Sequence, residues 1–136
     1  MLFRSVSNYM TKYKILIAED EIALLEALEE KLKKAGFETF SVTNGEDATK
    51  ELERKNFDFM VLDLVMPHKD GYDVLHDMRE LGIELPVAVL SNLSDRGDLE
   101  EAESRYPVAY FPKAKTEMSE IVSYIKQVLE NRESLD

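Results

Sequence analysis

The chain has 136 residues, of which 44% are hydrophobic, no cysteine, and a formal net charge of -11. This length suits one globular domain with one core, and the absence of cysteine excludes disulfides, thiolate catalysis and Cys-based zinc sites. The negative charge argues against direct binding of nucleic acid or an anionic membrane through a basic face. Because no apolar run reaches transmembrane length and the N-terminus lacks a secretory pattern, we expect a soluble cytoplasmic protein.

The chain divides into three expected parts. Residues 1–11 show no convincing periodicity, so we interpret them as a disordered leader or a cloning remnant. Residues 12–131 are expected to form the domain, and residues 132–136 a C-terminal tail.

The first elements of the domain are a strand at residues 13–18 and an amphipathic helix. The strand runs into three consecutive acids, Glu19-Asp20-Glu21, whose mutual repulsion needs an offset. In the helix we expect Asp20 near the cap and Gly36 as the stop. Its inner face is expected to carry Ile22, Leu25, Leu28 and Leu32.

A central buried strand follows a second strand and helix. The second strand is expected at residues 37–42 and the helix at 46–55. Residues 57–63 form a short apolar run, typical of a strand buried on both faces of a parallel sheet, and the run ends on Asp63. Pro67 and the Asp70-Gly71 pair then predict a tight loop that lets the aspartate face solvent.

The C-terminal half repeats the alternation of helix and strand. After Gly71 a helix is expected to end at Gly82, followed by a buried strand at 86–90 that leads into Ser91-Asn92. The remaining elements are a helix at 95–105, a strand at 108–112 ending at Lys113, and a helix capped by Thr116. Pro112 indicates an edge position for the last strand.

This order predicts an α/β fold with a doubly wound, five-stranded parallel sheet in the order 2-1-3-4-5. Strands 1, 3, 4 and 5 are then neighbours, and ligands in such sheets bind outside the carboxyl ends of the strands. Those ends carry Glu19-Asp20, Asp63, Ser91 and Lys113. Taken singly, the aspartate could be a turn former and the lysine a surface residue, but four neighbouring strands each present a polar group to one pocket.

The chemistry of this set points to phosphoryl transfer. Three close carboxylates need a counter-cation, and oxygen ligands favour Mg²⁺, with Mn²⁺ as an alternative. Lys113 adds a second positive charge, and Ser91 can bind an anion but lacks a histidine that would make it a nucleophile. We therefore expect in-line transfer of a phosphoryl group onto Asp63.

The set of residues resembles that of the receiver domain of two-component response regulators, which has a flavodoxin-like fold. The matching residues are Glu19-Asp20, Asp63, Met66-Pro67, Asp70-Gly71, Ser91, Tyr110 and Lys113. The resemblance implies that Asp63 accepts a phosphoryl group from a phosphohistidine of a sensor histidine kinase or phosphotransfer protein. It also implies that Asp20, Asp63 and the Val65 carbonyl bind the metal directly, with Glu19 acting through water.

The resemblance further implies a switch and a limited activity. Ser91 would follow the phosphoryl group and Tyr110 would swing inward, reshaping the surface of the fourth helix, fifth strand and fifth helix for an unknown effector or a phosphorylation-dependent homodimer. Such a domain is not a dedicated enzyme, but catalyses its own phosphorylation and dephosphorylation. Asn92 stands where the family usually has Ala or Gly and narrows access to the phosphoryl group. Val65 and Leu93 are apolar and occupy positions that in the family tune the rate of dephosphorylation. We therefore expect the phosphorylated state to decay slowly.

Two other functions remain open at this stage. An aspartate-nucleophile phosphohydrolase would need a carboxylate two residues after Asp63, where the chain has Val65. A phosphorylation-independent interaction module would retain the acidic pocket without using it. The cognate kinase, the signal and the downstream output are not encoded in any motif that we find.

Overall fold

The computed structural model describes residues 13–92 and 108–135. The expected leader at 1–11, the expected helix at 95–105 and Leu93 lie outside the described residues. The strands are β1 (Lys14–Ala18), β2 (Glu38–Val42), β3 (Phe59–Asp63), β4 (Val87–Ser91) and β5 (Val108–Pro112). The helices are α2 (Ile22–Lys34), α3 (Gly45–Arg54), α4 (Gly71–Glu80), the short 3₁₀ helix η1 (Lys113–Lys115) and α6 (Met118–Leu135).

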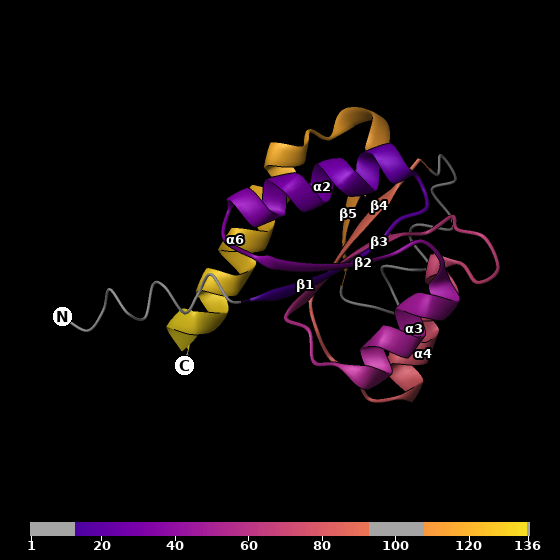
Figure 1. Ribbon diagram of the computed structural model, residues 1–136. Helices are drawn as coiled ribbons and strands as arrows, with labels where there is room; N and C mark the ends of the chain where they lie inside the picture. The colour runs from indigo at the N-terminus through magenta and orange to yellow at the C-terminus, as the bar shows by residue number, and fades with distance from the viewer. Residues whose placement is uncertain (1–12, 93–107, 136) are drawn as a thin grey trace.

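The five strands form one parallel sheet in the order β2-β1-β3-β4-β5, which confirms the predicted fold and topology. Helices α2 and α6 cover one face of the sheet, and α3 and α4 cover the other (Figure 1). β5 lies at an edge, as its terminal proline predicted.

Two hydrophobic layers hold the helices to the sheet. In β1, Ile15 and Ile17 face the layer beneath α2 and α6, whereas Leu16 and Ala18 face α3 and α4. All five residues of β3 and all five of β4 are buried, as expected for central parallel strands. Each large apolar side chain buried there contributes about 1.5–3 kcal/mol, and together these layers fix the positions of the strand ends.

The helix ends differ in detail from the sequence-based expectation. Glu21, in an extended conformation, precedes α2 and makes no side-chain capping bond, and Asp20 lies one residue before it, near the cap as expected. At α6 the N–H of Glu117 donates to Glu120 at 3.0 Å, half of a capping box, so Glu117 rather than Thr116 precedes the helix.

The C-terminal helix is longer than expected. α6 continues to Leu135, past the expected domain end at 131. Its inner stripe packs as predicted, with Ile121, Ile125 and Leu129 buried. The stop of α2 is also confirmed, because Gly36 adopts φ 100°, a conformation that favours glycine.

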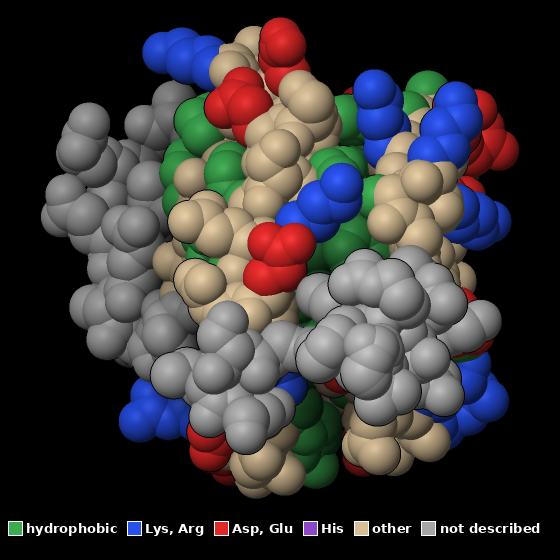
Figure 2. All heavy atoms as spheres, turned by 90° about the vertical axis from the view of Figure 1, so that its left-hand side faces the viewer, with side chains coloured by type: hydrophobic (Ala, Val, Ile, Leu, Met, Phe, Trp, Pro, Cys, Tyr) green, Lys and Arg blue, Asp and Glu red, His purple; other side chains and the backbone are tan. Residues whose placement is uncertain are grey.

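The side of the molecule opposite the carboxyl ends of the strands has a mixed surface. Figure 2 shows acidic and basic side chains interspersed around hydrophobic ones on this face, with no continuous basic patch among the side chains that it colours. No helix in the described part of the chain is long and apolar enough to cross a membrane.

Candidate functional site

The predicted polar residues converge at the carboxyl ends of β1, β3, β4 and β5. A cavity of about 320 Å³ lies there, and its lining consists of Asp20, Glu21, Asp63, Val65, Ser91, Asn92 and Lys113. The parallel register brings these residues together from positions up to 93 apart in the chain, because every strand ends at the same edge. The juxtaposition expected from the sequence is therefore present in the structure.

Lys113 joins the acids of two strands. Its Nζ lies 3.1 Å from Asp63 Oδ2 and 3.1 Å from Glu19 Oε2, and it donates a hydrogen bond to each. The aspartate and the glutamate are buried, with exposed fractions of 3% and 1%, and the lysine side chain is 10% exposed. An ammonium held so closely between two buried carboxylates offsets part of their charge.

Glu21 is a member of this site that the sequence analysis did not assign. Its Oε1 lies 2.6 Å from Lys113 Nζ, and its side chain is 59% exposed. The acidic triplet Glu19-Asp20-Glu21 was the available signal. Which of its members meets the lysine depends on how the chain turns from β1 into α2.

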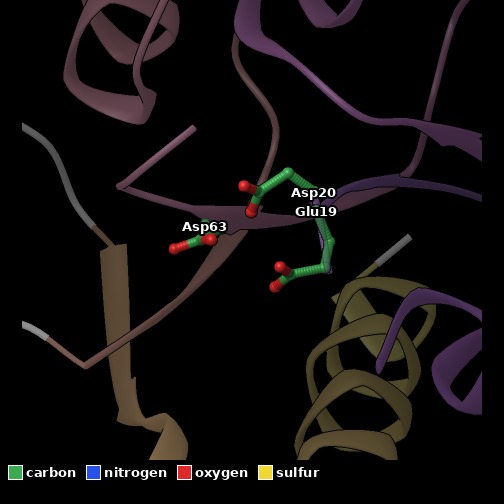
Figure 3. Close-up of side chains that lie close together, drawn as sticks. All are labelled: Glu19, Asp20 and Asp63. Carbon is green, nitrogen blue, oxygen red and sulfur yellow. The ribbon is translucent and has the colours of Figure 1, made fainter. Parts of the chain in front are cut away.

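Three carboxylates gather where a cation could bind. Glu19, Asp20 and Asp63 each offer an oxygen within 4.8 Å of the others, and Figure 3 shows these carboxylates grouped together. Glu19 Oε1 is buried and accepts no hydrogen bond within the described part of the chain, although the lysine amine lies 3.1 Å away. An under-coordinated buried oxygen beside two further carboxylates fits a hard divalent cation such as Mg²⁺.

Burial raises the pKa of both inner carboxyls. The pKa of Glu19 rises from 4.5 to about 7, chiefly through desolvation, with a smaller contribution from the charge of Asp63. Desolvation also raises the pKa of Asp63, against the opposing hydrogen bonds from Val65 and Lys113. For Lys113, burial lowers the pKa, but hydrogen bonds to Glu21, Asp63 and Glu19 outweigh it and raise the pKa overall. The single ammonium thus does not offset the desolvation of the acids.

The backbone beside Asp63 is tightly fixed. The Val65 N–H donates to Asp63 Oδ1 at 3.1 Å, and the Gly71 N–H donates to the Leu64 carbonyl at 2.9 Å. A Cβ at Gly71 would lie 2.5 Å from the Asp63 carbonyl oxygen, so a side chain is excluded where α4 begins. Val65 itself is 58% exposed at the cavity.

Ser91 and Tyr110 occupy neighbouring strands at the same edge. Ser91 is fully buried at the end of β4, and the Tyr110 hydroxyl donates to the Ser91 carbonyl at 3.2 Å. Tyr110 is half-buried in β5. The two residues assigned to the switch therefore touch each other in the structure.

Comparison with known proteins gives a consistent result. A family model described as the response regulator receiver domain matches residues 15–126. The chain is 37% identical over 89 residues to the probable transcriptional regulator ycf27 of Porphyridium aerugineum, covering 65% of this chain and 37% of that protein. This chain spans little more than a third of the length of the curated relatives that it matches.

Solved structures show the same fold. The Francisella response regulator 1452 receiver domain matches with a TM-score of 0.82 at 24% identity, covering 89% of this chain and 99% of that one. The response regulator TrrA of Thermotoga maritima, solved in complex with Mg²⁺-BeF, matches with a TM-score of 0.73 at 28% identity, covering 85% and 97%.

Proposed function

The chain belongs to the family of response regulator receiver domains of two-component systems, and on that premise we propose that Asp63 accepts a phosphoryl group from a phosphohistidine. The observation that carries this proposal is the position of Lys113 Nζ, which lies 3.1 Å from Asp63 Oδ2 and 3.1 Å from Glu19 Oε2. The donor would be a sensor histidine kinase or a phosphotransfer protein.

The carboxylates present fit the metal that such a reaction uses. Asp20, Asp63 and the Val65 carbonyl would hold Mg²⁺ directly, with Glu19 acting through water. When bound, the cation supplies positive charge that offsets the carboxylates and the oxygens of the incoming phosphoryl group. Two observations support this assignment: Glu19 Oε1 accepts no hydrogen bond within the described part of the chain, and three acids are grouped together.

Asp63, Lys113 and Val65 would each have a separate role in the transfer step. An Asp63 oxygen attacks phosphorus as the P–N bond to the donor imidazole breaks, and the electron pair leaves with the imidazole nitrogen, which then takes up a proton. The Lys113 ammonium, already hydrogen-bonded to Asp63, neutralises charge on the transferring oxygens. The Val65 N–H holds the second carboxylate oxygen and so orients the attacking one.

Ser91 and Tyr110 would convert phosphorylation into a change of surface. The Ser91 hydroxyl would bind the phosphoryl group, and the Tyr110 ring, which already donates to the Ser91 carbonyl, would move inward with it. The surface that changes comprises the expected helix at 95–105, β5 and α6, and it would bind an effector or a second copy of the chain. We also place this reaction in the cytoplasm.

Labelling with a small phosphodonor tests the function. Incubation of the protein with Mg²⁺ and acetyl phosphate should give one acyl phosphate by intact mass, lost in Asp63→Asn and retained in Asp73→Asn, an exposed control on α4. Continuous release of inorganic phosphate would support a phosphohydrolase instead. No labelling of the wild-type protein would support a phosphorylation-independent interaction module.

The acyl phosphate should also persist. Val65 is apolar and 58% exposed at the cavity, so it cannot hold an attacking water. We expect Val65→Asn to shorten the lifetime of the labelled protein several-fold once the phosphodonor is removed. Rapid loss of label from the wild-type protein in Mg²⁺ buffer would contradict slow decay.

A further inference from the structure

The loop between β3 and α4, residues 64–70, contains a tight turn. The Lys69 N–H donates to the Pro67 carbonyl at 2.7 Å, and His68 between them adopts φ 66°. A residue other than glycine in this conformation costs on the order of 1–3 kcal/mol and persists only where its surroundings hold it. Some contact must therefore hold this end of the loop.

Lys69 makes that contact through its backbone. Its carbonyl accepts a hydrogen bond of 3.0 Å from the N–H of Gly45, the first residue of α3. Such an N–H has no partner within its own helix, so the loop satisfies a donor that would otherwise be free. A Cβ at Gly45 would collide with the Lys69 carbonyl, which explains glycine at the start of α3.

The side chain of Lys69 reaches the neighbouring helix. Its ammonium forms an ion pair with Asp77 of α4, and Asp77 Oδ2 also accepts a hydrogen bond of 3.1 Å from Thr49 of α3. Helices α3 and α4 lie side by side on the same face of the sheet (Figure 1). The contacts close a ring in which loop, α3 and α4 each hold the other two. We call Lys69, Asp77 and Thr49 the loop anchor.

We propose that the loop anchor is a positioning site for the cation, because it fixes the loop that supplies the Val65 carbonyl. This inference rests on the proposed function, in which that carbonyl is a metal ligand. Val65 lies four residues before Lys69, and its own N–H is bound to Asp63, so movement of the loop displaces both carbonyl and carboxylate. Groups that orient metal ligands raise affinity because less ordering is needed when the metal binds.

Mg²⁺ affinity of the folded protein tests the loop anchor. By isothermal titration calorimetry, Lys69→Met and Asp77→Asn should each bind Mg²⁺ about 3–10-fold more weakly than wild type, and Lys69→Arg should bind nearly as tightly. Charge alone predicts the opposite for Lys69→Met, since loss of a cation makes an acidic protein more attractive to Mg²⁺. Lys50→Met is the matched control, because it removes the same charge from an exposed ion pair with Glu46 on α3.

The position of the loop can be followed separately from affinity. The amide resonances of Val65 and Gly45 should shift in Lys69→Met and Asp77→Asn and stay in place in Lys50→Met. Asp77→Asn keeps the size of the side chain, so the shifts of the Val65 and Gly45 amides can be read in it even if Lys69→Met does not fold. Unchanged or tighter Mg²⁺ binding in Lys69→Met or, failing that, in Asp77→Asn would overturn the inference.

The two proposals fail differently. Normal Mg²⁺ binding by wild type with no effect of the anchor variants overturns the loop anchor and leaves the proposed function intact. No Mg²⁺ binding by the wild-type protein overturns the metal-dependent function, and the positioning site with it.

Discussion

Two lysine–carboxylate clusters lie near the loop that follows β3, and they differ in how deeply their side chains are buried. Lys113 meets Asp63 and Glu19 where all three side chains are at most 10% exposed, whereas Lys69 and Asp77 are 28% and 26% exposed. Burial raises the pKa of both inner acids in the first cluster. In the second, the hydrogen bond from Lys69 outweighs desolvation and lowers the pKa of Asp77.

The difference shows how the same chemical pair serves two purposes. The Lys69–Asp77 pair is balanced in charge and partly hydrated, so it can hold the loop against α4 without a further ion. The Lys113 cluster sets one ammonium against four acids, of which Asp20 and Glu21 are exposed and hydrated, whereas the charges of the buried Glu19 and Asp63 are not relieved by water. A site with unrelieved negative charge is suited to bind a cation, as the proposed phosphoryl transfer requires.

Removal of Lys113 and of Lys69 in turn should give the largest difference in stability between the two clusters. Without divalent cations at about pH 8, Lys113→Met should lower the free energy of unfolding by about 3 kcal/mol, because two buried carboxylates lose their cation. Lys69→Met should lower it by less than about 1 kcal/mol, since its pair is partly hydrated. Urea denaturation measures both, and equal losses would show that burial does not distinguish the two clusters.

The dependence of stability on pH should show the next largest effect. The pKa of Glu19 is about 7 in the folded protein and near 4.5 when unfolded, so its contribution to stability is fully present below pH 4.5 and is lost as the pH rises through 7. Between about pH 5 and pH 8, the metal-free protein should lose roughly 2 kcal/mol from this group.

Substitution identifies the residue responsible. Glu19→Gln should remove the part of the pH dependence due to Glu19 and leave that of Asp63, whose pKa is also raised, whereas Glu46→Gln, which removes an exposed acid on α3, should leave the profile unchanged. Asp77 does not interfere, because its lowered pKa confines its effect to more acidic pH, where stability falls as the carboxylate is protonated. An unchanged pH profile in Glu19→Gln would contradict the raised pKa.

These two clusters also show how far the sequence could predict the molecule. The strand ends are specified by short apolar runs closed by Asp63, Ser91 and Lys113, and parallel topology then forces the ends together. Sheet order and the main site followed from that reasoning. The start of the last helix did not, since the choice between Thr116 and Glu117 before α6 depends on one residue of backbone geometry.

The loop anchor could not be predicted from the sequence. Lys69, Thr49 and Asp77 are ordinary surface residue types, and their meeting depends on the crossing of α3 and α4 and on the turn at His68. The ion pair of Glu21 with Lys113 could not be predicted for the same reason. Sequence patterns predict which helix or strand a residue belongs to. Which side chains of different elements meet depends on how those elements pack in the folded protein.

Binding of Mg²⁺ to the Lys113 cluster should release a proton. Because Glu19 is half protonated near pH 7, Mg²⁺ must displace its proton, and affinity should rise about tenfold between pH 6 and pH 8. Calorimetry in two buffers with different ionisation enthalpies should detect proton release at pH 6.5, and Glu19→Gln should release fewer protons than the wild-type protein. Absence of proton release in wild type would mean that Glu19 is already ionised.

The smallest expected effect belongs to the hydroxyl of the loop anchor. Thr49→Val keeps the shape of the side chain and removes the hydrogen bond to Asp77, so it should cost about 0.5 kcal/mol of stability and weaken Mg²⁺ binding by less than twofold. In an Asp77→Ala background the same substitution should cost nothing, because the acceptor is gone. An equal cost in both backgrounds would assign the effect of Thr49 to packing within α3. A cost confined to the background with Asp77 would show that the loop anchor couples α3 to α4.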